Sequence, residues 1–132
     1  MLENYFDETG RLKKEIFIED AKRMAEIFSN DDLKYNALRN FYNKIREIEF
    51  KLKRNKIFEN IKQDIYSLVP LVNYQFNRGI VPFSYKNFIE KQVELAVKDE
   101  QNFYAFLEYH KSILAYSKEK QEFQEREGRR SR

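Results

Sequence analysis

The sequence contains no cysteine, one histidine and no tryptophan among its 132 residues. Without cysteine there are no disulfides, thiolate metal ligands or cysteine nucleophiles, and a single histidine argues against a zinc site or a Ser-His site. Only three glycines and two prolines are present, which leaves few of the turns that β-sheets require. These absences favour an all-α fold, and we expect no cofactor and no metal site.

Long apolar runs are also missing. No stretch approaches the 18 apolar residues of a membrane span, and residues 1–15 carry scattered charges without the apolar core of a signal peptide. We therefore expect a cytoplasmic protein without membrane association. The sequence does contain twelve phenylalanines and nine tyrosines, and its apolar content of 42% is sufficient for a hydrophobic core. Length and composition predict a single globular domain.

Apolar residues recur at helical spacing from Leu12 to Leu114 and predict a single-domain bundle of five to six helices. We expect residues 1–10 to fray, Asn36 and Ser84 to act as N-caps, and Pro70 to kink or restart a helix that Gly79 ends. The expected helices cover Leu12–Phe28, Asn36–Asn55, a kinked pair from about Ile57 to Arg78, a helix from Ser84 to just before Asp99, and one from about Phe103. The helical domain is expected to span residues 1–117, followed by a charged tail, residues 118–132, that is disordered or frayed.

The segment from Leu38 to Arg54 carries two stripes on one predicted helix. The apolar stripe has spacings of 3, 4, 3 and 4 and consists of Leu38, Phe41, Ile45, Ile48 and Leu52. The basic stripe has heptad spacing and consists of Arg39, Arg46 and Lys53. At about 100° per residue, the basic stripe lies roughly a third of a turn from the centre of the apolar stripe. One helix therefore combines a core-facing side with a cationic side.

The positive charge of the chain is concentrated around this helix. Eight basic and three acidic residues lie between Arg39 and Lys62, a local net charge of +5, whereas the rest of the chain sums to −2. Cations spaced about 10.5 Å apart along a helix axis suit a row of phosphates rather than a single base. Phe50 falls on the basic side and Tyr42 between the two stripes, so an exposed aromatic side chain could stack on a base, anchor a neighbouring subunit or close a crevice in the monomer.

Catalytic patterns are weak by comparison. Glu90 and Glu94 have the i, i+4 spacing of a solvent-exposed helix face. Asp31 and Asp32 are expected to lie in the loop that leads into the next helix. His110 is expected on the inner side of the last helix. At such a position a hydrogen-bonded histidine within the core is a better interpretation than a catalytic general base. We expect no enzymatic activity, although an enzyme using Asp31, Asp32 or His110 is the alternative that metal-dependent turnover would reveal.

Three segments of the sequence form a recognisable series. They are the Leu-Arg-x-Phe-Tyr-x-x-Ile-x-x-Ile pattern of residues 38–48, the Pro-x-x-x-Tyr-x-x-x-Arg pattern of residues 70–78, and Tyr109-His110-Lys111 near the C-terminus. In kind and in order these segments resemble those of the small, all-helical subunit of type III-A CRISPR effector complexes, the Csm complexes. The resemblance implies a non-catalytic subunit that stacks in several copies and braces the duplex of crRNA and target RNA, while other subunits of the complex cut nucleic acid.

The residues expected to contact RNA follow from this resemblance and from charge. The family's basic positions have counterparts at Arg39, Arg46, Lys53 and Arg78, and Arg54 is added on charge grounds alone. Phe50 and the connector of residues 80–83 are candidates for self-association in a stacked filament, with a dimer possible in isolation. Arg39 could instead pair with Asp31 or Asp32. The alternative function is a helical protein-interaction module, such as a toxin–antitoxin or phage regulatory component, whose basic side binds an acidic protein.

Overall fold

The structure is a computed structural model that describes the backbone of residues 1–130 and the side chains of residues 1–117. Its elements are η1 (Lys14–Ile16), α1 (Glu19–Asn30), α2 (Tyr35–Asn55), η2 (Phe58–Ile61), α3 (Lys62–Tyr66), α4 (Leu68–Asn77), α5 (Phe83–Ala96) and α6 (Glu100–Arg130). No β-strand occurs within residues 1–130, where one isolated bridge joins Phe6 to Leu12. The predicted all-α bundle is confirmed. None of the described helices is long and apolar enough to cross a membrane.

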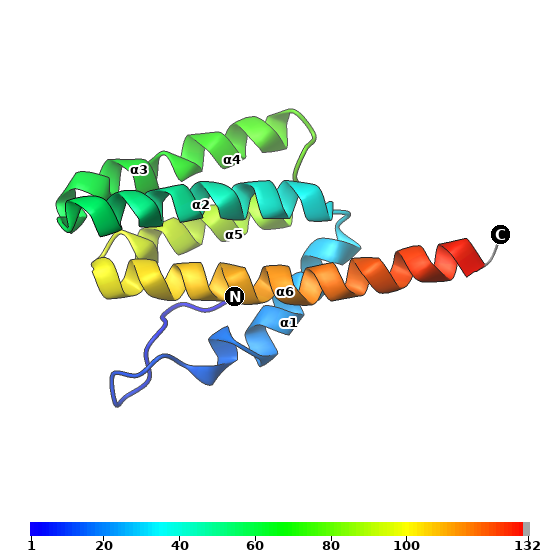
Figure 1. Ribbon diagram of the computed structural model, residues 1–132, viewed down its shortest axis with the longest axis horizontal. Helices are drawn as coiled ribbons and strands as arrows, with labels where there is room; N and C mark the ends of the chain where they lie inside the picture. Colours follow the sequence, from blue (N-terminus) through cyan, green and yellow to red (C-terminus); the bar gives the residue numbers. More distant parts are fainter. Residues whose placement is uncertain (131–132) are drawn as a thin grey trace.

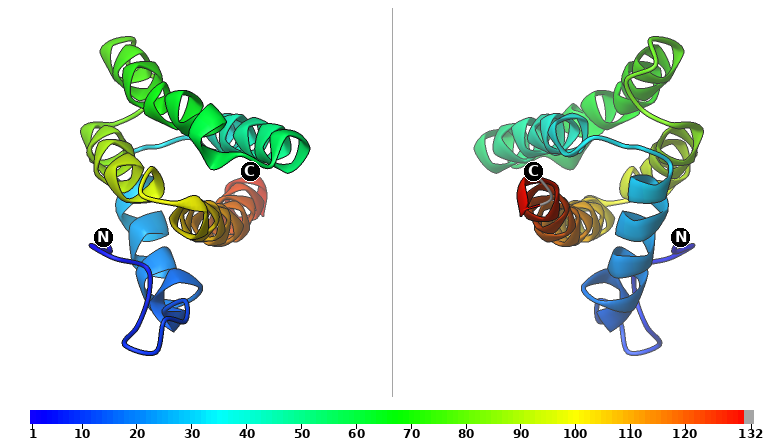
Figure 2. Two further views of the ribbon diagram at one scale, coloured as in Figure 1. Left: turned by 90° about the vertical axis from the view of Figure 1, so that its left-hand side faces the viewer. Right: turned by 90° about the vertical axis from the view of Figure 1, so that its right-hand side faces the viewer.

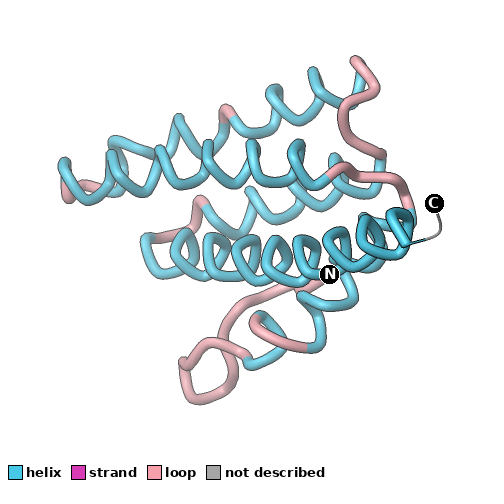
Figure 3. Tube along the Cα trace, turned by 45° about the vertical axis from the view of Figure 1, so that its right-hand side comes forward, coloured by secondary structure: helices cyan, strands magenta, loops and turns pink. Residues whose placement is uncertain are grey.

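The longer helices α2, α5 and α6 run side by side, and α1 crosses α6 on the side away from α2 (Figures 1 and 2). The short helices α3 and α4 follow α2 back along its length, and α4 packs mainly on α5. Irregular backbone is concentrated in the N-terminal segment and in short connections between helices (Figure 3). This arrangement leaves one long side of α2 next to α6 and the other next to α3 and α4.

The apolar stripe of α2 is the centre of the core, as predicted. Its five side chains are at most 6% exposed. The ring of Phe41 packs edge-on against Tyr85 of α5, with centroids 5.5 Å apart, and stacks on His110 of α6 at 6.3 Å. His110 is fully buried and shares a hydrogen bond of 2.6 Å with the Tyr85 hydroxyl. Burial lowers the pKa of His110 to about 3, so the ring is neutral and contributes to the core.

Several helix ends differ from the prediction. The first predicted helix is interrupted, because η1 and α1 are separated by Phe17 and Ile18. Helices α2 and α5 begin one residue earlier than expected, after Lys34 and Pro82, and neither Asn36 nor Ser84 acts as the N-cap. The last helix begins at Glu100 rather than Phe103, because the Asp99 carboxylate accepts a hydrogen bond of 2.8 Å from the backbone N–H of Asn102.

The predicted kinked pair is present as α3 and α4. Pro70 lies in the first turn of α4, where its missing N–H leaves no hydrogen bond unmade. Gly79 ends this segment with φ of +73°, and the N–H of the following Ile80 donates to the Gln75 carbonyl at 2.8 Å. A positive φ of this kind is the reason for a glycine at this position.

The expectation that residues 1–10 fray is wrong. Tyr5 is fully buried, and its hydroxyl donates a hydrogen bond to the Gln92 side-chain carbonyl of α5. The Gln92 amide in turn donates to the Leu2 carbonyl at 3.0 Å, and the ring of Tyr5 packs edge-on against Tyr109 of α6. The N-terminal segment is therefore tied to helices almost 90 residues later in the sequence. The predicted tail of residues 118–132 stays a prediction, because its side chains lie outside the described residues.

Candidate nucleic-acid interface

The basic residues of α2 lie on two sides of the helix. One side reaches from Glu49 across the solvent-exposed surface of the helix. This side, which we call the cationic face, consists of Arg39, Arg46, Lys53 and Arg54 together with Phe50 and Glu49. The side next to α3 and α4, which we call the paired face, consists of Lys44, Lys51 and Lys62 of α3 together with Glu47, Asp64 and Glu59. The two faces differ in how completely their charges are neutralised.

Arg39 and Arg54 lie near opposite ends of the cationic face, and both are exposed. Neither forms an ion pair with any of residues 1–117. The Arg39 guanidinium lies over the Tyr35 ring, 5.8 Å from its centroid, whereas Asp32 pairs with Lys34 at 2.8 Å. The alternative partners of Arg39 in the preceding loop are therefore not used. Both guanidinium groups are available for an external anion.

Glu49 is the acidic member of the cationic face, and its role was not recognised from the sequence. It is only 8% exposed, and its two oxygens lie 2.8 Å from Arg46 Nε and 3.6 Å from Lys53 Nζ. The Arg46 contact is an ion pair without the alignment of a hydrogen bond. Burial raises the pKa of Tyr104 on α6, and the charges of Glu100 and then of Glu49 add to this shift. One carboxylate thus holds two of the predicted RNA-binding side chains.

Arg46 is further fixed by aromatic neighbours. Its guanidinium lies 6.0 Å from the centroid of Tyr42 and 5.2 Å from that of Phe50, and its Nη1 donates a hydrogen bond of 3.4 Å to the Tyr42 hydroxyl. The pKa of Arg46 is raised, first by this hydrogen bond and then by electrostatic interaction with Tyr42 and Glu49. Four cations against one carboxylate leave the cationic face with a net charge of +3. The ordered guanidinium and this excess suit a polyanion.

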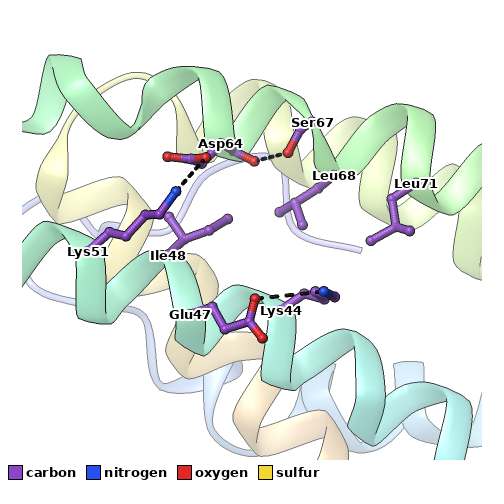
Figure 4. Close-up of a pocket in the computed structure, with 8 residues that line it drawn as sticks. All are labelled: Lys44, Glu47, Ile48, Lys51, Asp64, Ser67, Leu68 and Leu71. Carbon is purple, nitrogen blue, oxygen red and sulfur yellow. Dashed lines mark hydrogen bonds and ion pairs between the residues drawn. The ribbon is translucent and has the colours of Figure 1, made fainter.

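The paired face has no such excess. Lys44 pairs with Glu47 at 3.7 Å, Lys51 with Asp64 at 3.3 Å, and Lys62 with Glu59 at 3.0 Å. Two of these pairs border a groove of about 330 Å³ between α2 and α4, with an apolar floor (Figure 4). The floor consists of Ile48, Leu68 and Leu71. Its neutral rim is unsuited to a phosphate backbone.

Arg78 is not brought onto the cationic face. It follows the last residue of α4, its guanidinium lies 5.7 Å from the centroid of Tyr74, and its Nη1 donates to the Tyr74 hydroxyl at 3.4 Å. Figure 2 shows α4 diverging from α2 toward this end. The structure therefore places four of the five predicted RNA-binding residues on one helix and the fifth at a separate position.

The residues considered for catalysis lie on different elements: Asp31 and Asp32 follow α1, Glu90 belongs to α5 and His110 to α6. Asp32 is exposed and paired with Lys34, and His110 is buried in the core. Glu90 pairs with Lys86 at 2.8 Å and accepts a hydrogen bond from Asn73, and these contacts lower its pKa, the Lys86 contact first. Within residues 1–117, no three histidine, aspartate or glutamate side chains cluster in a way that could hold a metal ion.

Comparison with known proteins gives a single assignment. No curated protein and no solved structure matches the chain. The family model described as Csm2 Type III-A matches residues 11–122, a range that begins before η1 and includes α1 to α5 and the beginning of α6. This range contains all three segments on which the resemblance was based. The chain belongs to the Csm2 Type III-A family and is a subunit of a type III-A CRISPR effector complex.

Proposed function

We propose that this chain is a non-catalytic structural subunit that holds the duplex of crRNA and target RNA by its phosphate backbone, in the cytoplasm, as one of several stacked copies in the Csm complex. The observation that carries the proposal is the net charge of +3 on the cationic face, next to a paired face that is neutral. Family membership makes the chain a subunit of a type III-A CRISPR complex, and the charge distribution supports the cationic face as its RNA-binding surface.

The geometry of the cationic face suits phosphates better than base edges. Arg39, Arg46 and Lys53 are one heptad apart, about 10.5 Å along the helix axis, so they can contact phosphates in succession. Such contacts do not depend on the RNA sequence. A subunit that works with guides of any sequence requires this independence. Arg78 would add a separate backbone contact from the end of α4, beyond the reach of α2.

Self-association is the second part of the proposal. Ile80 and Phe83 are 46% and 62% exposed at the connection between α4 and α5. Large apolar side chains exposed together are typical of protein contacts. They lie on a different part of the molecule from the cationic face, so one copy can contact its neighbour and RNA at the same time.

The experiment compares two double variants of the full chain with equal loss of charge. Arg39→Gln/Arg54→Gln removes two cations that have no ion-pair partner among residues 1–117, and Lys44→Gln/Lys51→Gln removes two paired cations from the same helix. Binding to a single-stranded RNA is measured as a function of salt. The first variant should lower the slope of log K against log salt by about 1.4, since each lost phosphate contact removes about 0.7.

The second variant should bind close to the parent, because its lysines are already neutralised. Circular dichroism controls for folding. An unchanged affinity and slope in Arg39→Gln/Arg54→Gln, or equal losses in both variants, would contradict the proposed RNA surface. In that case the cationic face would fit the alternative role, contact with an acidic protein.

A further inference from the structure

Phe50 is a large apolar side chain that α2 leaves in solvent. It is 51% exposed, whereas the apolar stripe of the same helix is buried. It lies on the cationic face rather than in the core, so its apolar ring stays in contact with solvent. An exposed phenyl group within a row of cations therefore suggests a ligand with both an apolar surface and negative charge.

The surroundings of Phe50 are ordered on one side and open on the other. The Arg46 guanidinium, held by Glu49 and Tyr42, lies over the ring at 5.2 Å from its centroid. The ring also lines a shallow surface depression together with Glu47, Lys51, Lys53 and Arg54. Glu47 is paired with Lys44 at 3.7 Å and Lys51 with Asp64 at 3.3 Å. The positive excess of the depression therefore comes from Arg54 and from Lys53, which shares Glu49 with Arg46.

We infer that Phe50 is a stacking platform for one unpaired RNA base, whose flanking phosphates are held by Lys53 and Arg54. Lys53 and Arg54 follow Phe50 by three and four residues and so lie one helical turn away on the same side. A base offers a flat π-surface to the ring, and its phosphates offer the charge that the two cations require. A base within a continuous duplex is already stacked on its neighbours, so the ligand must be unpaired.

This inference rests on the proposed function but adds to it. Backbone contacts alone make no use of an aromatic ring and do not distinguish paired from unpaired RNA. A stacking site does distinguish them. The chain would then hold the RNA at positions where a base leaves the stack, in addition to following its phosphates.

The test uses the full chain with a single-stranded 12-nucleotide RNA and a fully paired 12-base-pair RNA duplex. Phe50→Ala should weaken binding of the single strand by about 5- to 150-fold, the range for loss of one base–aromatic stack, with an unchanged salt slope. Binding of the duplex should stay within about twofold of the parent, a margin well below the loss of one stack. The matched control is Tyr66→Ala, since Tyr66 is an aromatic side chain, 55% exposed, that belongs neither to the cationic face nor to the proposed self-association surface.

A second variant gives a direct signal. Phe50→Trp introduces the sole tryptophan of the chain, and its fluorescence should be quenched by the single strand and not by the duplex. Single-strand affinity at the parent level in Phe50→Ala, while Arg39→Gln/Arg54→Gln still lowers the salt slope, would overturn the stacking site and leave the proposed function standing. Equal losses on both RNAs, or loss of self-association without an effect on RNA, would also overturn it. A parent chain that binds neither RNA would overturn both proposals.

Discussion

The side of α2 next to α3 and α4 carries lysines that each have a carboxylate partner. The cationic face carries four cations and one carboxylate, Glu49, which pairs with Arg46 and Lys53 only. Composition alone does not distinguish these sides, since both are rich in lysine and arginine. What differs is the position of the acidic residues. Asp64 and Glu59 come from α3 and η2, which pack against only one side of α2.

This difference shows that the local charge of a segment and the charge of a surface are separate quantities. Of the +5 between Arg39 and Lys62, the cationic face carries +3 and Lys56 at the end of α2 carries +1. The remaining +1 lies on the paired face, where Asp64, just outside this range, neutralises it. A ligand such as RNA responds to the surface, because phosphates within a Debye length of about 8 Å interact with the cations nearest to them. Removing the same number of charges is therefore expected to change RNA affinity on the cationic face and to leave it nearly unchanged on the paired face.

The largest expected effect on RNA binding comes from neutralising the three cations of the cationic face that are spaced seven residues apart. Arg39→Gln/Arg46→Gln/Lys53→Gln should weaken single-stranded RNA binding about 100-fold at ~0.1 M salt, because each phosphate contact contributes about fivefold under these conditions. The control with equal charge is Lys44→Gln/Lys51→Gln/Lys62→Gln on the paired face. Equal losses in the two triple variants, measured by fluorescence anisotropy, would show that net charge rather than surface position governs binding.

This triple variant also has a cost in stability. It leaves the buried Glu49 carboxylate without either cation, and an unpartnered carboxylate at 8% exposure is unfavourable. Thermal unfolding should therefore occur at a lower temperature than in the parent, and adding Glu49→Gln should restore most of the loss. RNA binding is to be measured well below the midpoint of unfolding, so that the two effects stay separate.

A smaller effect of opposite sign is expected for Glu49→Gln alone. Removing this carboxylate leaves Arg46 and Lys53 fully available to phosphates, which should strengthen RNA binding by about fivefold, the value of one added contact at ~0.1 M salt. Glu59→Gln removes the same charge from the paired face and should have little effect. If Glu49→Gln weakens binding instead, the carboxylate acts mainly by orienting Arg46, and the cationic face depends on order more than on charge.

The sequence predicted the features of α2 that depend on helical periodicity. Its C-terminal end, its buried stripe and its cationic side all follow from the sequence of one helix, and the structure agrees with them, whereas its first residue and N-cap differ. The role of Glu49 was missed because a helical wheel places this residue at the edge of the apolar stripe. Whether it is buried there depends on how α6 packs against α2, which the spacing along α2 does not reveal. The N-terminal segment was misjudged for a similar reason: Tyr5 and Gln92 are 87 residues apart, and local composition carries no sign of their contact.

The smallest effect on RNA binding is expected from pH. Between pH 8 and 6, affinity should stay constant, because arginine and lysine side chains remain charged in this range and the cationic face has no histidine. The single histidine, His110, is fully buried in the core. A change in affinity with a midpoint near pH 6.5 would place a titrating group in the binding surface and contradict the assignment of the site.

Folding stability, in contrast, should depend on pH through His110. Burial lowers its pKa to about 3 in the folded chain, against 6.5 in the unfolded chain, so below pH 6.5 the unfolded state binds a proton that the folded state does not. The free energy of unfolding should therefore fall as the pH decreases, by about 1.4 kcal/mol between pH 7.5 and 5.5. Urea unfolding at the two pH values measures the change. His110→Gln, whose amide can keep the hydrogen bond to Tyr85, should lose this dependence while binding RNA as the parent does. A dependence of the same size in that variant would mean that another group is responsible.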